Sequence, residues 1–287
     1  RRVLFRSTKH DNTATFTTND TGTTGSASVT VTDCQGADLT VTKTAVPYFT
    51  RTYKWGISKS VDDANVFTAG GASHTFNYTV NVTHDAGTDS GWYISGKITV
   101  SNPNDWEDIT TTVTDAAPGG TCTVTGGVDV VVEAGKSIEL PYTCTFTAGA
   151  SGTNTATATW DKAAASTPNG SASGTAGYAF VTPTTLVDEE VTVTDSLYGS
   201  LGAVSYNDPS PKTFTYSLTF NDPAGKCTSH TNTASFTTND TGTTGSASQT
   251  VTDCQGADLT VTKTAVPYFT RTFADRKSTR LNSSHRT

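Results

Sequence analysis

Residues 75–83 read TFNYTVNVT, and this stretch decides the fold class because apolar and polar residues alternate through all of it. A period of two places one set of side chains on each face of a β-strand. The same alternation recurs in residues 92–100 and 138–146. One buried and one solvated face is typical of antiparallel strands. Gly, Asn and Asp clusters separate these segments, as they do in a β-sandwich.

The composition of the 287 residues also favours strands over helices. Threonine makes up about a fifth of the chain, and its stiff β-branched side chain disfavours helices. We therefore predict an all-β protein built from tandem antiparallel β-sandwich domains. A net charge of −7 argues against nucleic acid as a partner. No apolar run approaches the roughly 20 residues of a membrane helix, so we expect no membrane contact within this fragment.

Both ends of the chain are interpreted as translated sequencing adapter rather than protein. Residues 275–280, DRKSTR, can be encoded GAT CGG AAG AGC ACA CGT, and the reverse complement of that DNA encodes the RVLFR of residues 2–6. We therefore set aside residues 1–7 and 274–287. The formal charge then falls from −7 to −13, because three positive charges leave with the first segment and a net three with the second. The remainder is expected to be an interior piece of a longer acidic protein.

A long repeat organises what remains. Residues 8–53 return at 228–273, an offset of 220, with scattered changes such as Val29 to Gln249. Scattered changes favour true tandem repeats over duplicated data, and a period this long suits two domains per repeat. We expect residues 8–38 to be the last strands of a preceding repeat, 39–180 one sandwich domain, 181–256 a second, and 257–273 the start of the next repeat.

A weaker repeat inside the period supports two related domains. The motif VTD occurs at 113–115 and 193–195, and NTA occurs at 154–156 and 232–234. The stretch YTCTF at 142–146 resembles YSLTF at 216–220.

The five cysteines indicate an oxidising compartment. None forms a CxxC pair, so a zinc site is not expected. We predict disulfides between Cys122 and Cys144 and between Cys227 and Cys254. Cys34 is the repeat mate of Cys254, and the residue that would pair with it falls at position 7, within the adapter. Paired cysteines favour an extracellular or cell-surface setting, with buried free thiols as the alternative.

Three polar residues share the phase of core-facing residues in the predicted first domain. They are Lys59, Asp115 and Asn154, and Lys43 is an alternative lysine because it is also in the inward phase. A buried ammonium requires partners, and a desolvated lysine tends to lose its proton and become a nucleophile. Attack on an asparagine carboxamide polarised by an acid would release ammonia and leave a Lys–Asn amide. These residues are therefore a candidate intramolecular isopeptide site, with a hydrogen-bonded Lys–Asp pair as the simpler reading.

The chain resembles a known family in three short motifs: DLTVTK at 38–43, VTDAAPG at 113–119 and NTAT at 154–157. They are similar to the conserved repeat domain of bacterial surface and secreted proteins. The resemblance implies tandem domains of immunoglobulin-like or prealbumin-like type. The related collagen-adhesin B-type repeats carry isopeptide bonds built from a lysine, an acid and an asparagine, which implies Lys59, Asp115 and Asn154 here.

We therefore expect a non-enzymatic stalk or spacer of a bacterial cell-surface or secreted adhesin-like protein, without cofactor or metal. No GxSxG elbow or other catalytic set is present in the sequence. The expected partners are neighbouring repeats of the same chain, with glycans or host surface proteins as further candidates. The alternative is a carbohydrate- or host-protein-binding sandwich, which a tryptophan exposed in a concave loop would favour. Four buried tryptophans would favour the stalk.

Overall fold

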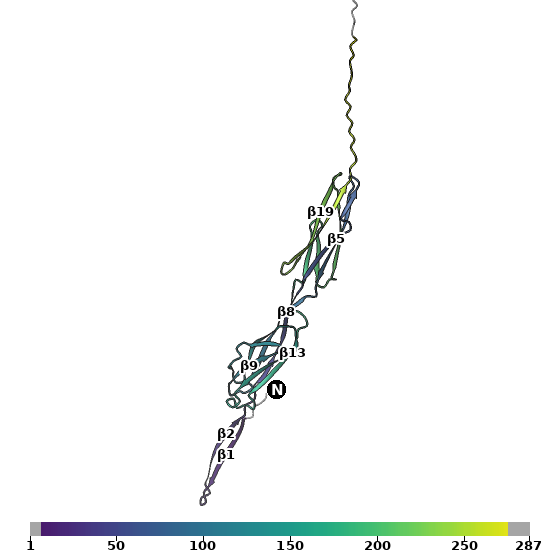
Figure 1. Cartoon of the computed structure of the whole chain (residues 1–287). Helices are drawn as coiled ribbons and strands as arrows, with labels where there is room; N and C mark the ends of the chain where they lie inside the picture. Colours follow the sequence, from purple (N-terminus) through teal and green to yellow (C-terminus); the bar gives the residue numbers. More distant parts are fainter. Residues whose placement is uncertain (1–6, 275–287) are drawn as a thin grey trace, which may run out of the picture.

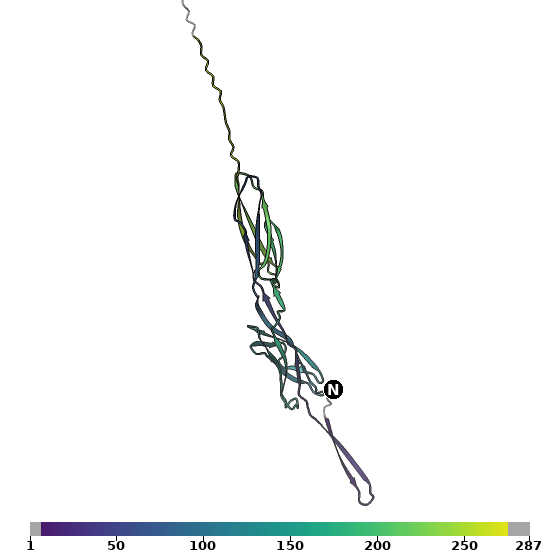
Figure 2. The ribbon, with the colours of Figure 1, turned by 90° about the vertical axis from the view of Figure 1, so that its right-hand side faces the viewer.

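The computed structural model describes residues 7–274, and every regular element in that range is a β-strand. The all-β prediction is confirmed. Figure 1 shows an elongated molecule in which a projecting hairpin, two lobes and an extended segment follow one another. The view turned by 90° shows the same order (Figure 2). Within residues 7–274 no helix is long and apolar enough to cross a membrane.

Lobe 1 contains two sheets. One has the order β10–β12–β8–β4–β15, with β3 also paired to β8, and the other has the order β11–β9–β13–β14. Core residues from both sheets form a single cluster that includes Ile98, Val113 and Ala156. The strands are β3 (Thr40–Lys43), β4 (Val46–Thr52), β8 (Thr88–Ser101), β9 (Ile109–Ala116), β10 (Gly120–Val124), β11 (Val130–Val132), β12 (Ser137–Phe146), β13 (Ser151–Trp160), β14 (Ser171–Ala179) and β15 (Thr185–Val187).

Lobe 2 repeats the plan with a three-stranded sheet, β18–β7–β5, and a five-stranded sheet, β17–β16–β19–β20–β6. Its separate core includes Phe76, Tyr78, Val193 and Phe236. The strands are β5 (Trp55–Val61), β6 (Asn65–Thr68), β7 (His74–His84), β16 (Glu190–Asp195), β17 (Gly199–Ser205), β18 (Lys212–Phe220), β19 (Cys227–Thr238) and β20 (Thr244–Gln255).

The chain passes between the lobes three times. It builds β3 and β4 of lobe 1, crosses to β5–β7 of lobe 2, returns for β8–β15 and crosses again for β16–β20. Lobe 1 therefore has two chain segments, 39–52 and 88–187, and lobe 2 has 55–84 and 190–255. This differs from the expected continuous division at residue 180. Alternation in the sequence fixes which face of a strand is buried, but it does not say which sheet the strand joins.

The two lobes share one strand arrangement. The order β12–β8–β3 in lobe 1 matches β18–β7–β5 in lobe 2, and β9–β13–β14 matches β16–β19–β20. The matching strands carry the motifs that recur in the sequence: VTD lies on β9 and β16, and NTA lies on β13 and β19.

The projecting hairpin consists of β1 (Ser7–Thr17) and β2 (Thr24–Cys34), which pair with each other alone among the described strands. Its repeat mate is the β19–β20 hairpin, which is incorporated in lobe 2 beside β16. Phe16 is 62% exposed, whereas its mate Phe236 is 4% exposed. Nearly the same sequence is thus solvated in one copy and part of a core in the other. Residues 257–273, the mate of 37–53, contain no strand.

Both predicted disulfides are confirmed. Cys122 of β10 faces Cys144 of β12, and Cys227 of β19 faces Cys254 of β20, with Cα separations of 3.9 and 3.8 Å. Two disulfides favour a non-reducing environment. The side chain of Cys34, predicted to be free, lies outside what the structure describes.

Candidate functional site

A buried lysine lies at the centre of lobe 2. Lys59 is on β5, and its Nζ donates hydrogen bonds to Asp195 Oδ2 at 2.5 Å and to the Tyr216 hydroxyl at 2.8 Å. The side chains of Lys59 and Asp195 have no exposed surface. The ammonium also lies 4.9 Å from the centre of the Tyr78 ring, a cation–π distance. Lys59 points inward because it shares the period of the apolar residues on β5.

An asparagine completes this cluster. Asn232 on β19 donates from Nδ2 to the Tyr216 hydroxyl at 3.1 Å, and its Oδ1 accepts a hydrogen bond from Ser196 Oγ at 3.1 Å. The Tyr216 hydroxyl in turn donates to Asp195 Oδ2 at 2.5 Å. The tyrosine oxygen therefore contacts the lysine, the acid and the asparagine. We call Lys59, Asp195, Tyr216 and Asn232 the lobe 2 cluster.

Lobe 1 buries the same four residue types. Lys43 on β3 forms an ion pair with Asp115 on β9, and neither side chain has exposed surface. The lysine Nζ lies 4.0 Å from the centre of the Tyr142 ring. Asn154 is fully buried, and its Oδ1 has no hydrogen-bond partner among the described residues. We call Lys43, Asp115, Tyr142 and Asn154 the lobe 1 cluster.

A disulfide sulfur separates two members of the lobe 1 cluster. Cys144 Sγ lies 3.2 Å from Asp115 Oδ2 and 3.6 Å from Asn154 Nδ2. Asp115, Cys122 and Cys144 bring a carboxylate and two sulfurs together in the way a metal site would. The two sulfurs are bonded to each other, so neither offers the thiolate that a metal requires.

Strand register shows that the two clusters are equivalent. Asp115 faces Ala156 and Asp195 faces Ala234, and in both cases the asparagine is two residues before that alanine. The lysines and tyrosines also occupy equivalent positions in the two lobes. In each lobe both residues pair with one central strand, which is β8 in lobe 1 and β7 in lobe 2. Lys43 faces Ile98 and Tyr142 faces Gly96, while Lys59 faces Val80 and Tyr216 faces Tyr78. The lysine partner is two residues after the tyrosine partner in each lobe.

The predicted site is therefore divided between the lobes. Asp115 and Asn154 lie in lobe 1, but their lysine is Lys43, the alternative named from the sequence. Lys59 belongs to lobe 2, where its acid is Asp195. The inward phase was correct for all four residues, since each side chain is buried. The error in grouping Lys59 with Asp115 came from the crossing between β4 and β5, which phase does not reveal.

The environment shifts the acid–base properties of both clusters. Burial lowers the pKa of Lys43 and of Lys59, although the neighbouring carboxylates act in the opposite direction. Burial alone would raise the pKa of Asp195, but hydrogen bonds from Lys59, Tyr216 and two backbone amides bring it below its ordinary value. Burial raises the pKa of Tyr142 to about 12, and the charge of Asp115 adds to the effect. Burial and the hydrogen bond to Asp195 raise the pKa of Tyr216 as well, so both tyrosines are neutral hydrogen-bonding groups near pH 7.

Each Lys–Asp contact allows one proton to pass from Nζ to the carboxylate, although the hydrogen bonds that lower the pKa of Asp195 oppose that transfer in lobe 2. Passing one proton from Nζ to the carboxylate would give a neutral amine and a neutral acid, a form that a dry environment favours. The amine is then a nucleophile, and the acid can donate a hydrogen bond to a carboxamide oxygen.

Sequence reasoning missed the two tyrosines. The signal was present, because Tyr142 begins YTCTF and Tyr216 begins YSLTF, and these two segments were recognised as related. Compared with known proteins, the chain matches no family model and no curated sequence.

Proposed function

We propose that this chain is part of the stalk of a bacterial cell-surface or secreted protein, and that each lobe is closed by a Lys–Asn amide. The bonds would join Lys43 to Asn154 and Lys59 to Asn232. The observation that carries the proposal is the recurrence of one buried Lys–Asp–Tyr–Asn set, in one strand register, in two lobes that differ in most of their sequence.

The architecture supports a mechanical role. Each lobe has two sheets around a single core, as in a β-sandwich of immunoglobulin-like or prealbumin-like type. The lobes follow one another along the length of the molecule (Figure 1). The 220-residue repeat would extend that line. A buried Lys–Asp pair adds little net stability compared with apolar packing. Stability alone therefore does not explain why the pair occurs in both lobes, and a chemical role does.

The bond would form in balanced steps. Lysine Nζ gives one proton to the aspartate and attacks Cγ of the asparagine, while the protonated acid hydrogen-bonds to Oδ1. The acid then passes its proton to the departing Nδ2, and the C–N bond breaks to release ammonia. The product is a secondary amide, and the acid is regenerated through the second proton from Nζ. In lobe 1, Asn154 Oδ1 is available as the acceptor that the acid requires.

Intact mass tests both bonds in the full chain. With disulfides reduced, the chain is expected to weigh about 34 Da less than its sequence requires, since each bond removes one ammonia of about 17 Da. Lys43→Arg and Lys59→Arg should each restore about 17 Da relative to their own calculated masses. Lys97→Arg is the matched control, because Lys97 is 64% exposed and paired with Glu139 at the surface. The mass deficit of the Lys97→Arg variant should stay at about 34 Da.

The acids test the chemistry separately from the nucleophiles. Asp115→Ala should abolish only the lobe 1 deficit, and Asp195→Ala only the lobe 2 deficit. Peptide mapping should then find linked peptides containing residues 43 and 154 or 59 and 232. A parent mass equal to the calculated one would contradict the proposed bonds, and the clusters would then be hydrogen-bonded ion pairs.

The positions of the four tryptophans bear on the alternative function, a carbohydrate- or host-protein-binding module. Trp160 is buried and donates to Thr167, Trp55 donates to the Asp188 carbonyl, and Trp92 stacks on Phe49. These three contribute to packing, which favours the stalk. Trp106 is 43% exposed and is the one sugar-stacking candidate among the four. A glycan-binding role predicts that Trp106→Ala abolishes retention on a glycan array, whereas the stalk predicts no retention by either form.

A further inference from the structure

The segment CQGAD occurs twice, at 34–38 and at 254–258, and the structure presents it from two different sides. The first copy leads into a complete lobe 1. The second copy leaves a complete lobe 2. Taken together, the two copies describe both halves of the connection between one repeat and the next. This inference rests on the proposed tandem array, but it does not depend on the crosslinks.

Lobe 1 holds the last three residues of the segment. Asn104 is fully buried, accepts a hydrogen bond from Ala37 N at 2.8 Å and donates one to Ala37 O at 2.8 Å. Asn169 donates from its backbone and side chain to the Asp38 carboxylate at 2.8 and 2.7 Å. Gly36 N donates to Ser166 O at 3.2 Å.

Lobe 2 holds the second and third residues of the segment. Gln255 is 3% exposed, and its Nε2 donates to Ala72 O at 2.8 Å and to Asp253 Oδ2 at 2.9 Å. Gly256 N donates to Thr68 O at 2.9 Å, which extends the parallel pairing of β20 with β6. The carbonyl of Gly256 packs so closely on Gly70 that a Cβ there would lie 2.2 Å from it.

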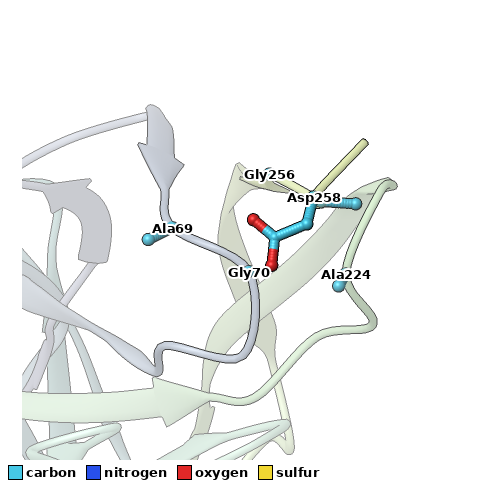
Figure 3. Close-up of a pocket in the computed structure, with 6 residues that line it drawn as sticks. Ala69, Gly70, Ala224, Gly256 and Asp258 are labelled. Carbon is cyan, nitrogen blue, oxygen red and sulfur yellow. The ribbon is translucent and has the colours of Figure 1, made fainter. Parts of the chain in front are cut away.

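A hollow of about 360 Å³ opens at this end of lobe 2. Figure 3 shows it between the Ala69–Gly70 turn and the start of the terminal segment, with the Asp258 carboxylate directed into it. Ala257 and Asp258 form part of its wall. These are the repeat mates of Ala37 and Asp38, the two residues that lobe 1 grips.

We propose that the hollow is the docking surface for lobe 1 of the following repeat, and that its occupant is that repeat's copy of the 166–169 loop. Gln255 would be held by lobe 2, and Ala257 and Asp258 by the next lobe 1. Gly256 is then the single residue between the two grips. Consecutive repeats would meet at a short, stiff joint rather than a flexible linker.

The amide of this glycine has two competing acceptors. Gly36 N donates to Ser166 O, and its mate Gly256 N donates to Thr68 O. One amide hydrogen makes one full bond or two weaker shared ones, so docking must weaken one of these contacts. The Thr68 bond extends the β6–β20 ladder, and we assign the amide to it. The asparagine contacts to the next two residues then carry the attachment of the following lobe.

The joint can be tested by completing the next repeat in the full chain. Residues 257–273 already match 37–53, so a second copy of 54–256 placed after residue 273 supplies the missing lobes. Spin labels introduced as non-canonical residues would replace the exposed Thr215 on β18 and the added copy of Thr143 on β12. Pulsed electron paramagnetic resonance should give one narrow distance distribution, about as narrow as that of a label pair within one lobe. A distribution as broad as that of a variant with Gly-Ser-Gly-Ser inserted after Gly256 would overturn the proposal.

Two matched variants test the contact proposed between Asp258 and the asparagine of the next lobe 1. Asp258→Ala removes the carboxylate that the next lobe's asparagine would bind and should broaden the distribution. Asp38→Ala is the same change in the same sequence, but it lies outside the labelled joint and should leave the distribution unchanged. A narrow distribution in both variants would overturn the contacts assigned here. Intact mass of the same samples reports crosslinking independently, so failure of the joint and failure of the crosslinks are distinguishable.

Discussion

A pulling force should release very different lengths of chain when Lys59 and Lys43 are replaced by arginine. The reason is topological, since the segment 88–187 of lobe 1 lies within the chain between β7 and β16 of lobe 2. A bond from residue 59 to 232 therefore encloses that segment as well as most of lobe 2. The disulfide at 227 and 254 closes the remaining hairpin.

The magnitudes follow from the shortest covalent path between residues 39 and 255. With both amide bonds and the disulfide in place, the load runs along the chain from residue 39 to 59 and crosses the 59–232 amide. It then runs back along the chain from 232 to 227 and crosses the disulfide to 254. About 27 residues bear the load, or about 9 nm at roughly 3.4 Å per residue. In Lys59→Arg the path runs through the 43–154 bond and then along 154–227. About 78 residues, or about 27 nm of contour, would then bear the load. The length released is this contour minus the separation of residues 39 and 255 in the folded protein, which is the same in every variant.

Lys43→Arg is the informative control. The direct path from 39 to 59 already bypasses the 43–154 bond, so the load-bearing contour should remain about 9 nm and the released length should equal that of the parent. Single-molecule force spectroscopy on the full chain, held by its ends, would measure these increments, and the segments outside 39–255 add the same offset to every variant. A larger increment for Lys43→Arg than for Lys59→Arg would refute the interleaved arrangement. A load-bearing contour of about 57 nm in the parent, the path that remains when only the two disulfides bridge the chain, would refute the crosslinks.

Three further predictions concern stability. Phe236→Ala should destabilise lobe 2 by about 3–5 kcal/mol, because a buried ring is lost, whereas the same change at its exposed repeat mate Phe16 should shift a chemical denaturation curve by less than about 0.5 kcal/mol. Reduction of the Cys227–Cys254 disulfide, which closes a loop of 27 residues, should cost lobe 2 about 3.5 kcal/mol by the chain-entropy model, measured by denaturant unfolding with and without reductant. Hydrogen bonds from Arg51 hold the pKa of Asp89 below its ordinary value, so their contribution is present above that ordinary value and is lost as pH falls through the lowered one. In Arg51→Gln, carboxyl carbon NMR should show Asp89 titrating at a higher pH than in the parent.

Period-two alternation predicted the buried faces well. Phe76, Tyr78, Val80 and Val82 all lie at or near zero exposure, as their spacing required. The disulfides were predictable because the internal repeat restricts which cysteines share a domain. Lys59 was correctly placed in a core, but in the wrong one. A strand's own sequence determines its inner face, whereas the residues that this face meets in the core can be more than 100 residues away, as Asp195 is from Lys59.

The tyrosines show a different limit. Tyr142 lies in the alternating stretch 138–146, and Tyr216 lies in the related stretch 216–220; neither pattern says anything about the hydroxyl. Only the position of the hydroxyl shows that Tyr216 contacts lysine, acid and asparagine together. The match between residues 142–146 and 216–220 indicated equivalent strands, but equivalence does not specify a hydrogen-bond partner.

The three crossings between lobes also set an order of events during synthesis. Strands β5 and β7 emerge early, yet β16–β20 of the same lobe follow more than 100 residues later. Contacts this distant in sequence form slowly, and the apolar face of β7 is open to other chains until they do. In an array, the nearly identical hairpin of a neighbouring repeat is a competing partner. Residue 249 can discriminate, because Gln249 donates to the Lys59 carbonyl at 2.8 Å and its mate in the preceding repeat is Val29, which cannot. Divergence between repeats would then protect each one from pairing with its neighbour.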